Sequence, residues 1–240
     1  MKELKEYIVN ENNFFKNLGV GQKTLIKKWI EENCKLVLDT SYTINDDMTI
    51  DVDDSIIIDG YDKKELPDYI QFNKVNVMFI IRNSNKLETL KGCPKECKDF
   101  NCSGCKKLKN LKDSPQSYEI LNCSNCDSLE TLDGISETCK ILKCKECNKL
   151  ENLLGIKSEY MHTVNCDNCK KLESLEGLPL KLHHLHCNNC EKLMTLEYCP
   201  EDLVSLSCKG CGGNFTQEYL TRNNIYVYRT EVDKKTKLKR

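Results

Sequence analysis

The chain has 240 residues, 36 Lys and Arg against 37 Asp and Glu, and 17 cysteines. The balanced charge argues against a nucleic-acid binder that works by bulk positive potential, and the 30% of charged residues, with no long apolar run, argues against a membrane span. Residues 1–6 lack the apolar stretch of a signal peptide, so we expect an intracellular protein in a reducing compartment. The cysteines are then expected to be thiols or metal ligands rather than disulfide partners.

The N-terminal segment is predicted to form two short helices and a β-hairpin. Apolar residues recur at helical spacing in Leu4–Leu18 and in Thr24–Ile30, and Gly19 and Gly21 stand between these stretches. On both sides of Asn45-Asp46-Asp47, apolar residues then recur at every second position, a pattern that indicates a β-hairpin. We expect this segment to abut the first repeat, with the helices acting either as a cap or as a small separate binding module.

The middle of the chain repeats with a period of about 21 residues. Cysteine pairs of the form C-x-x-C recur at steps of 21, 21, 22, 21 and 21 residues, and leucines follow the first cysteine of the first five pairs by six and nine residues. Another apolar residue precedes each first cysteine by two, and a Gly or Pro turn closes several units. The pairs are Cys102/Cys105, Cys123/Cys126, Cys144/Cys147, Cys166/Cys169, Cys187/Cys190 and Cys208/Cys211.

One unit reads L-x-x-L-x-C-x-x-C-x-x-L-x-x-L-x-G-x-P. It resembles the leucine-rich repeat, L-x-x-L-x-L-x-x-N/C-x-L, in which the first cysteine takes an inward leucine slot and the second takes the Asn/Cys slot at the turn. Short units of this kind are most similar to bacterial and viral leucine-rich repeat proteins, including large-phage and giant-virus examples. The resemblance implies an α/β repeat solenoid with a parallel β-sheet on one face, usually concave, and short turns on the other.

The limits of the repeats divide the chain into three parts. One unit before the first cysteine pair, Ile81 replaces the first cysteine, which an apolar interior slot permits and a metal site does not. After the last pair, Phe215–Arg222 is predicted to be a short helix and Ile225–Tyr228 a final strand. We therefore predict an N-terminal helical and hairpin cap over 1–55, repeats over 56–211, and a C-terminal cap with the basic tail Lys234–Arg240 over 212–240.

Strand alternation predicts which side chains face solvent. Leu121 and Cys123 should point into the core while Asn122 points outward. The resulting outward surface is polar, rich in asparagine and nearly neutral, with two isoleucines adjacent in neighbouring strands, and an apolar pair among hydrogen-bonding groups is typical of a protein-contact centre. The predicted partner-binding residues are Ile120, Asn122, Ile141, Lys143, Lys145, Asn165, Asp167, His184 and His186.

The cysteine pairs also fit a different interpretation, because two C-x-x-C pairs can make one tetrahedral zinc site. The constant interval filled by leucines argues against zinc, and a buried free cysteine behaves as a small hydrophobe. His184 and His186 lie on one strand face and could bind a metal or titrate near neutral pH, but no carboxylate is placed beside them, so we expect solvated contact residues. We expect neither a metal nor another cofactor, and we keep a zinc-binding structural protein as an alternative.

The catalytic motifs G-x-x-x-x-G-K-S/T, G-x-S-x-G and H-E-x-x-H are missing, and so is G-x-G-x-x-G after a strand. We therefore expect a non-enzymatic module that recognises a protein partner through its strand face. The resemblance suggests a viral or microbial adaptor or inhibitor of host proteins, acting in the cytoplasm. A virion or assembly component is a further alternative. A monomer is favoured, and neither a membrane nor nucleic acid is an expected partner.

Overall fold

The computed structural model describes residues 20–37, 40–223 and 225–232. The predicted helix over Leu4–Leu18 and the basic tail Lys234–Arg240 lie outside these residues. No helix in the described ranges is long and apolar enough to cross a membrane.

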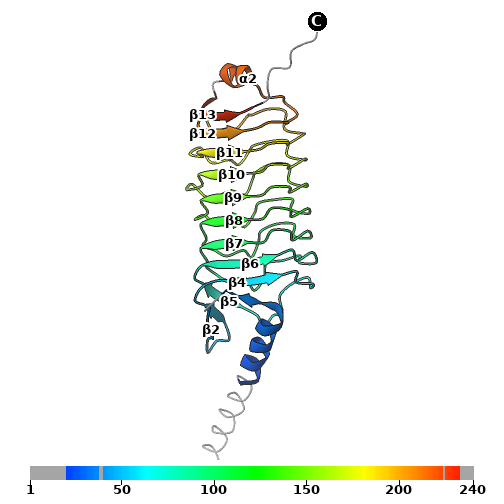
Figure 1. Ribbon diagram of the computed structural model, residues 1–240, viewed down its shortest axis with the longest axis vertical. Helices are drawn as coiled ribbons and strands as arrows, with labels where there is room; N and C mark the ends of the chain where they lie inside the picture. The colour runs from blue at the N-terminus through cyan, green and yellow to red at the C-terminus, as the bar shows by residue number, and fades with distance from the viewer. Residues whose placement is uncertain (1–19, 38–39, 224, 233–240) are drawn as a thin grey trace, which may run out of the picture.

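The chain forms a β-solenoid of about eight turns with about 21 residues in each turn (Figure 1). Nine parallel strands follow one another in sequence order along one sheet, and one antiparallel strand, β1 (Lys35–Leu36), adds to its N-terminal edge. The parallel strands are β4 (Ile56–Asp59), β6 (Met78–Arg82), β7 (Asp99–Asn101), β8 (Ile120–Asn122), β9 (Ile141–Lys143), β10 (Thr163–Asn165), β11 (His184–His186), β12 (Asp202–Ser207) and β13 (Tyr226–Glu231). The rest of each repeat is turns, so the prediction of a parallel sheet with short turns is confirmed.

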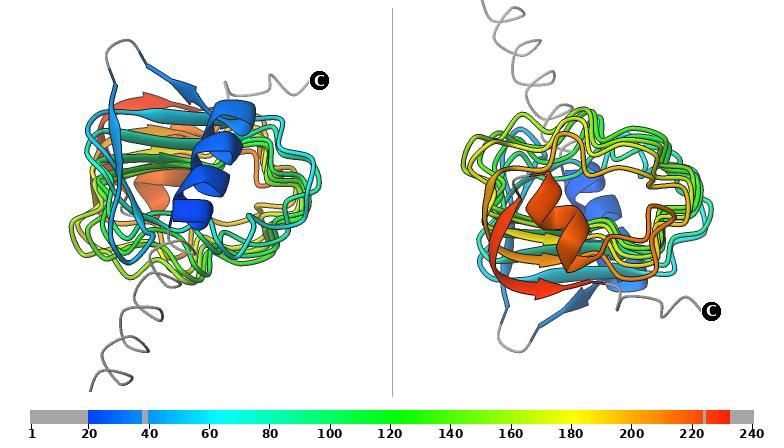
Figure 2. Two further views of the ribbon diagram at one scale, coloured as in Figure 1. Left: turned by 90° about the horizontal axis from the view of Figure 1, so that it is seen from below. Right: turned by 90° about the horizontal axis from the view of Figure 1, so that it is seen from above.

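Equivalent positions of successive repeats lie side by side in the sheet. Leu121 pairs with Leu142, and Leu142 pairs with Val164 across the one step of 22 residues between successive cysteine pairs. The extra residue of that step is therefore taken up in the loop before β10, where Tyr160 is 73% exposed. In the end-on views of Figure 2 the turns nearly superpose, so the stack is a nearly straight column without a marked concave face.

A smaller sheet lies beside the N-terminal turns. It consists of β2 (Tyr42–Ile44), β3 (Ile50–Val52) and β5 (Phe72–Val75), and β2 and β3 form the hairpin that was predicted around Asn45-Asp46-Asp47. β5 runs parallel to β3, and single bridges continue the pairing from Lys74 to Glu96 and then to Ser117.

The core consists of rows of buried side chains from equivalent positions of successive repeats, stacked along the column. The recurring leucines at six and nine residues after the first cysteine are buried, and so are both cysteines of every pair. At the N-terminal end the apolar slot before the first cysteine holds aromatic rings, with the centroids of Phe79 and Phe100 stacked 6.1 Å apart. Burial of apolar area is the main favourable term in folding, so the stacking of these side chains accounts for the register between neighbouring strands.

A helix over residues 20–33 crosses the N-terminal end of the column (Figure 2, left). Its Ile26, Trp29 and Ile30 are buried, and the ring of Trp29 meets that of Tyr61 edge-on at 5.9 Å. Gly21, which we expected to help separate two helices, lies inside this helix. Glycine costs a helix only about 1 kcal/mol, and the three buried contacts outweigh this cost.

The C-terminal end is closed by the predicted short helix and final strand. Helix α2 (Gln217–Arg222) begins after Thr216, whose hydroxyl accepts a hydrogen bond from the backbone N–H of Tyr219. Leu220 and Phe215 are buried on the last turn, and the hydroxyl of Tyr219 accepts a hydrogen bond from the backbone N–H of Leu196. Strand β13 then pairs in parallel with β12.

Two positions of the repeat adopt left-handed backbone conformations. The residue before the second-cysteine slot, which Ser84 fills in the unit before the first pair, has a φ between 52° and 72° in seven consecutive units, namely Asn83, Gly104, Asn125, Glu146, Asn168, Asn189 and Gly210. A second such slot lies in the closing turn, at Gly92, Asp113, Gly134, Gly155, Gly177 and Tyr198. Asn and Gly favour this conformation, so both slots select residue type for a backbone reason.

Candidate functional site

All nine predicted partner-binding residues lie on one surface, the outward side of the strands from β4 to β12, which we call the strand face. Each repeat contributes side chains to three rows, which run across the strands. In the repeat of β9 the first, second and third rows hold Ile141, Lys143 and Lys145. Register places Ile120 beside Ile141 in the first row and Asn122 beside Lys143 in the second. All nine are partly or fully exposed, whereas the alternate residues Leu121 and Leu142 are buried. Alternation along a strand produces this separation of inward and outward side chains.

The third row of the strand face is joined by an ion pair and by hydrogen bonds from the repeat of β9 to that of β12. The carboxylate of Asp167 lies 3.6 Å from the ammonium of Lys145 and accepts hydrogen bonds from the backbone and side-chain nitrogens of Asn188 at 2.8 and 2.9 Å. The side-chain oxygen of Asn188 in turn accepts from Ser207 Oγ and from the backbone N–H of Lys209, each at 2.9 Å. These bonds hold the polar half of the strand face in one geometry and border a hollow of about 340 Å³.

The N-terminal half of the strand face is more apolar than the sequence prediction indicated. The first row begins with Met78 and Asp99 before it reaches Ile120, and the second row begins with Ile57 and Ile80. Met78 and Ile57 are half-buried, and Ile80 is 9% exposed. Counting back by one and two repeats from Ile120 and Asn122 finds Met78, Asp99 and Ile80, which the predicted site omitted.

All four histidines of the chain lie on neighbouring repeats. His162 stacks on His183 with ring centroids 6.4 Å apart, and His183 meets His184 edge-on at 6.3 Å. Partial burial of His184, followed by the charges of the other three histidines, lowers its pKa. The prediction considered His184 and His186 and omitted His183, the residue directly before β11.

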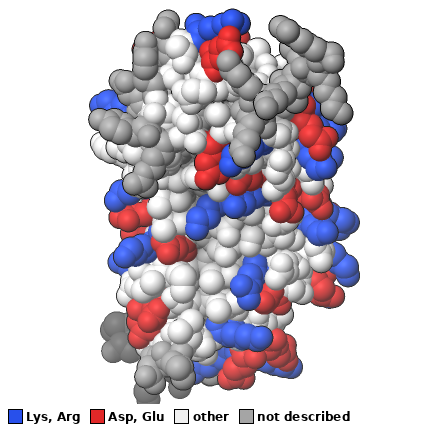
Figure 3. Space-filling view, turned by 45° about the horizontal axis from the view of Figure 1, so that its top comes forward, with Lys and Arg blue, Asp and Glu red and all other residues white. Residues whose placement is uncertain are grey.

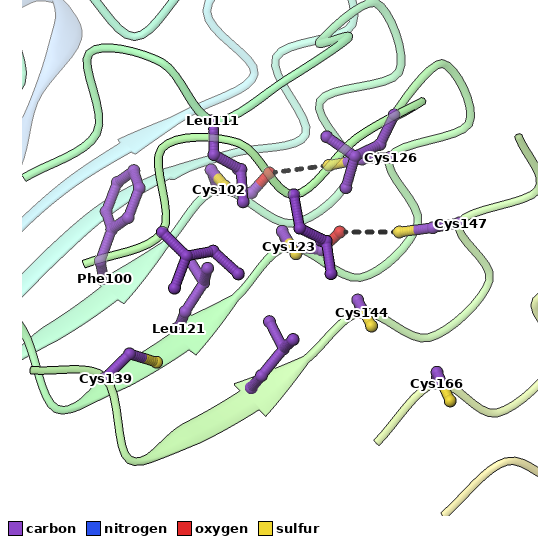
Figure 4. Close-up of a cluster of buried hydrophobic side chains, with 14 of the residues drawn as sticks. Phe100, Cys102, Leu111, Leu121, Cys123, Cys126, Cys139, Cys144, Cys147 and Cys166 are labelled. Carbon is purple, nitrogen blue, oxygen red and sulfur yellow. Dashed lines mark hydrogen bonds between the residues drawn. The ribbon is translucent and has the colours of Figure 1, made fainter. Parts of the chain in front are cut away.

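The two cysteine slots have different surroundings (Figure 4). The first cysteine lies inward among leucines, and the thiol of the second donates a hydrogen bond to the backbone carbonyl of the first-slot residue one turn earlier. This bond recurs six times, at 3.0 to 3.3 Å, from Cys105 to Cys211. Burial raises the pKa of the Cys105 thiol to about 12, so this thiol is neutral near pH 7.

The geometry of the cysteines differs from that of a zinc site. All 17 cysteines lie in the described part of the chain, and none of them forms a disulfide there. The described residues contain no group of three or more His, Cys, Asp or Glu side chains that could hold a metal ion. The second-slot thiols point toward carbonyl oxygens of the preceding turn, so the paired thiols do not converge on a common centre.

A groove of about 560 Å³ runs along the column beside the start of the strands. Buried Cys97 and Tyr118 form part of its floor, and charged side chains form its walls. The ion pairs Lys74–Glu96, at 3.0 Å, and Lys140–Glu119, at 2.9 Å, connect successive turns across it. In the view of Figure 3, acidic and basic side chains are interspersed along the column, without a large region of positive or of negative charge.

No protein-family model, curated protein or solved structure matches this chain. The strand face is therefore the feature from which a function has to be inferred.

Proposed function

We propose that the chain is a leucine-rich repeat protein of the short, cysteine-containing type that binds a protein partner through its strand face, without catalysis. The two cysteine slots support the family assignment. Cys123 lies inward where the family pattern has leucine, and Cys126 occupies the slot of a side chain that is Asn or Cys in that pattern. The thiol of Cys126 donates to a backbone carbonyl of the preceding turn, and an asparagine amide has a donor suited to the same contact.

The observation that carries the binding proposal is the half-buried apolar pair Ile120 and Ile141, which reaches the surface among hydrogen-bonded polar side chains. The two side chains lie side by side in the middle of the sheet, and the hydrogen-bonded row through Asp167 and Asn188 borders the polar part of the surface. Protein interfaces combine an apolar centre with a polar rim. A surface held by strand pairing loses little conformational entropy on binding, which favours affinity.

Photo-crosslinking tests this proposal. A benzophenone side chain placed at Asn122 or Asn165, on the strand face, should give a specific crosslinked protein in extract of the source cell. The same group at Lys109 or Glu130, exposed on the turns, serves as the matched control and should give none. Charge reversal of Lys143, combined with acidic replacements at Asn122, Asn165 and His186, should abolish the adduct. If the adduct forms equally from the control positions, or survives the four replacements, the strand face is not the binding site.

The cellular setting of this activity is part of the proposal. The dense buried thiols need a reducing compartment, because oxidation would introduce polar groups into the core. That the partner is a host protein, bound by a viral or microbial adaptor in the cytoplasm, stays a prediction from the resemblance of the repeat.

A further inference from the structure

One carboxylate on the strand face has apolar side chains beside it on both neighbouring strands. Register places Asp99 directly between Met78 on β6 and Ile120 on β8, with neighbouring strands about 4.8 Å apart. Ile141 extends this first row on β9, and Ile57 and Ile80 form the adjoining part of the second row. Asp99 therefore lies in the first row beside an apolar patch made of Ile57, Met78, Ile80, Ile120 and Ile141, and Asn101 on its own strand is its polar neighbour.

The side chain of Asp99 is not satisfied by the protein itself. Its Oδ1 atom is buried and has no hydrogen-bond partner in the described part of the chain. Other carboxylates of the strand face have donors. Asp59 accepts from Asn83 at 2.8 Å and from two nitrogens of Arg82 at 2.9 and 3.1 Å, and these donors lower its pKa. Asp167 accepts hydrogen bonds from Asn188 and lies in an ion pair with Lys145.

A carboxylate that is partly removed from water without a donor raises the free energy of the unbound protein. A cationic group supplied from outside would offset this penalty by pairing with the charge of the carboxylate, and the pairing would strengthen as the neighbouring apolar groups exclude water. Lysine and arginine suit the site because their aliphatic stems can pack on Met78 and Ile120 while the charged end reaches the carboxylate. Apolar residues beside the basic residue would then cover the remaining isoleucines.

We infer that Asp99 is the anchor for a basic side chain of the protein partner, and that the partner presents this side chain between apolar residues. The inference rests on the proposed function and adds to it the chemistry of the partner segment. The neighbouring polar half of the strand face, with the side-chain amides of Asn122 and Asn165, supplies hydrogen bonds to the flanking backbone.

Selection of displayed peptides on the full-length protein tests the inference. The probe is a library of random peptides of about 12 residues, long enough to cross several strands. Enriched peptides should share one Arg or Lys between apolar residues, and their affinity should fall about tenfold or more in Asp99→Asn. Asp133→Asn, on an exposed turn, is the matched control and should bind normally. Replacing the basic residue of the peptide by Glu should abolish its binding to the wild-type protein. The same altered peptide should bind the Asp99→Arg variant.

A measurement without any peptide separates this role from a structural one. Because Asp99 Oδ1 has no donor among the described residues, Asp99→Asn should leave the urea midpoint unchanged or raise it. If the carboxylate stabilised the fold, the replacement would lower the midpoint. The selected peptides could instead contain no basic residue, bind Asp99→Asn normally and lose binding to Ile120→Lys. That result would overturn the inference and leave the proposed function intact. Peptides that ignore all strand-face replacements, or a selection that enriches nothing, would contradict both.

Discussion

The thiol of Cys126 donates a hydrogen bond to the backbone carbonyl of Cys102, one turn earlier, at 3.3 Å. The two cysteines come from different slots of neighbouring repeats, so the bond ties successive turns together inside the core. A buried carbonyl without a donor costs free energy, which gives the second cysteine a role that the first does not share.

The two slots should therefore respond differently to substitution. Cys126→Ala removes the donor and leaves a cavity, and should lower the free energy of unfolding by about 2 to 3 kcal/mol. Cys123→Val should cost about 1 kcal/mol or less, because the equivalent slot already holds Ile81 one turn before the first pair. Urea denaturation measures both. Equal losses at the two positions would argue that the thiols act as a pair, as metal ligands do.

Zinc content gives an independent measure of the same distinction. We expect protein purified under reducing conditions to contain no stoichiometric zinc and to keep its circular dichroism spectrum in a strong chelator, because the second-slot thiols bond to carbonyls. About three zinc ions per chain, with unfolding on chelation, would show instead that the cysteine pairs are ligands.

Glu146 occupies a left-handed position, with a φ of 57°, that holds Asn or Gly in the other six units. Replacement by Asn or Gly should raise the free energy of unfolding by about 1 kcal/mol, because these residues adopt this conformation at lower cost. The backbone hydrogen bond from its N–H to Asp167 is retained in either variant. The reverse change, Asn125→Glu, is the matched control and should destabilise by a similar amount. Loss of stability in Glu146→Asn would mean that the Glu146 side chain makes a contact of its own.

Gly155 lies in the second left-handed slot, with a φ of 102°, and its backbone packs closely on the preceding turn. An added Cβ atom would lie 2.6 Å from the backbone nitrogen of Asp133, so Gly155→Ala should cost about 3 kcal/mol or more. Gly60→Ala is the control, since that glycine has a φ of 72° and no heavy atom within 4 Å of the added Cβ, and should cost about 1 kcal/mol. Thermal unfolding of the two variants measures the difference in stability. Equal losses of stability would show that the preceding turn can make room for a Cβ atom at Gly155.

Alkaline pH should weaken the fold through the buried thiols. Burial raises the pKa values of Cys97, Cys105 and Cys139 from 9.0 to about 12. Above pH 9 the unfolded thiols lose protons that the folded thiols keep, so stability is full below pH 9 and falls as pH rises toward 12. The slope approaches about 1.4 kcal/mol per pH unit for each such thiol.

Urea midpoints measured from near neutral pH upward test this dependence. The double variant Cys97→Val/Cys139→Val should show a shallower decline than the wild type, because two of the titrating groups are gone. An identical decline in both proteins would assign the alkaline sensitivity to other groups.

Much of the repeat was predictable because one short pattern specifies it many times. The apolar slots around Leu121, the outward position of Asn122, the turns after the second leucine, the hairpin and the C-terminal helix all follow from period and residue type. Gly21 was misassigned, since tertiary contacts of Trp29 outweigh a local propensity of about 1 kcal/mol. The period places Asp99 in the outward row, but its Oδ1 atom without a partner and the stacking of His183 on His162 depend on neighbouring turns.

The sequence by itself determined the length of the turn, the inward slots and the chemistry of the strand face, because these depend on residue type at a fixed spacing. Only the tertiary structure decided which groups of successive turns meet. The thiol of Cys126 reaches the carbonyl of Cys102, and His162 stacks on His183. Between Met78 and Ile120, the Oδ1 atom of Asp99 has no donor among the residues that the structure describes. These relationships join residues about one repeat apart, and they depend on the register and spacing of strands that pattern alone does not specify.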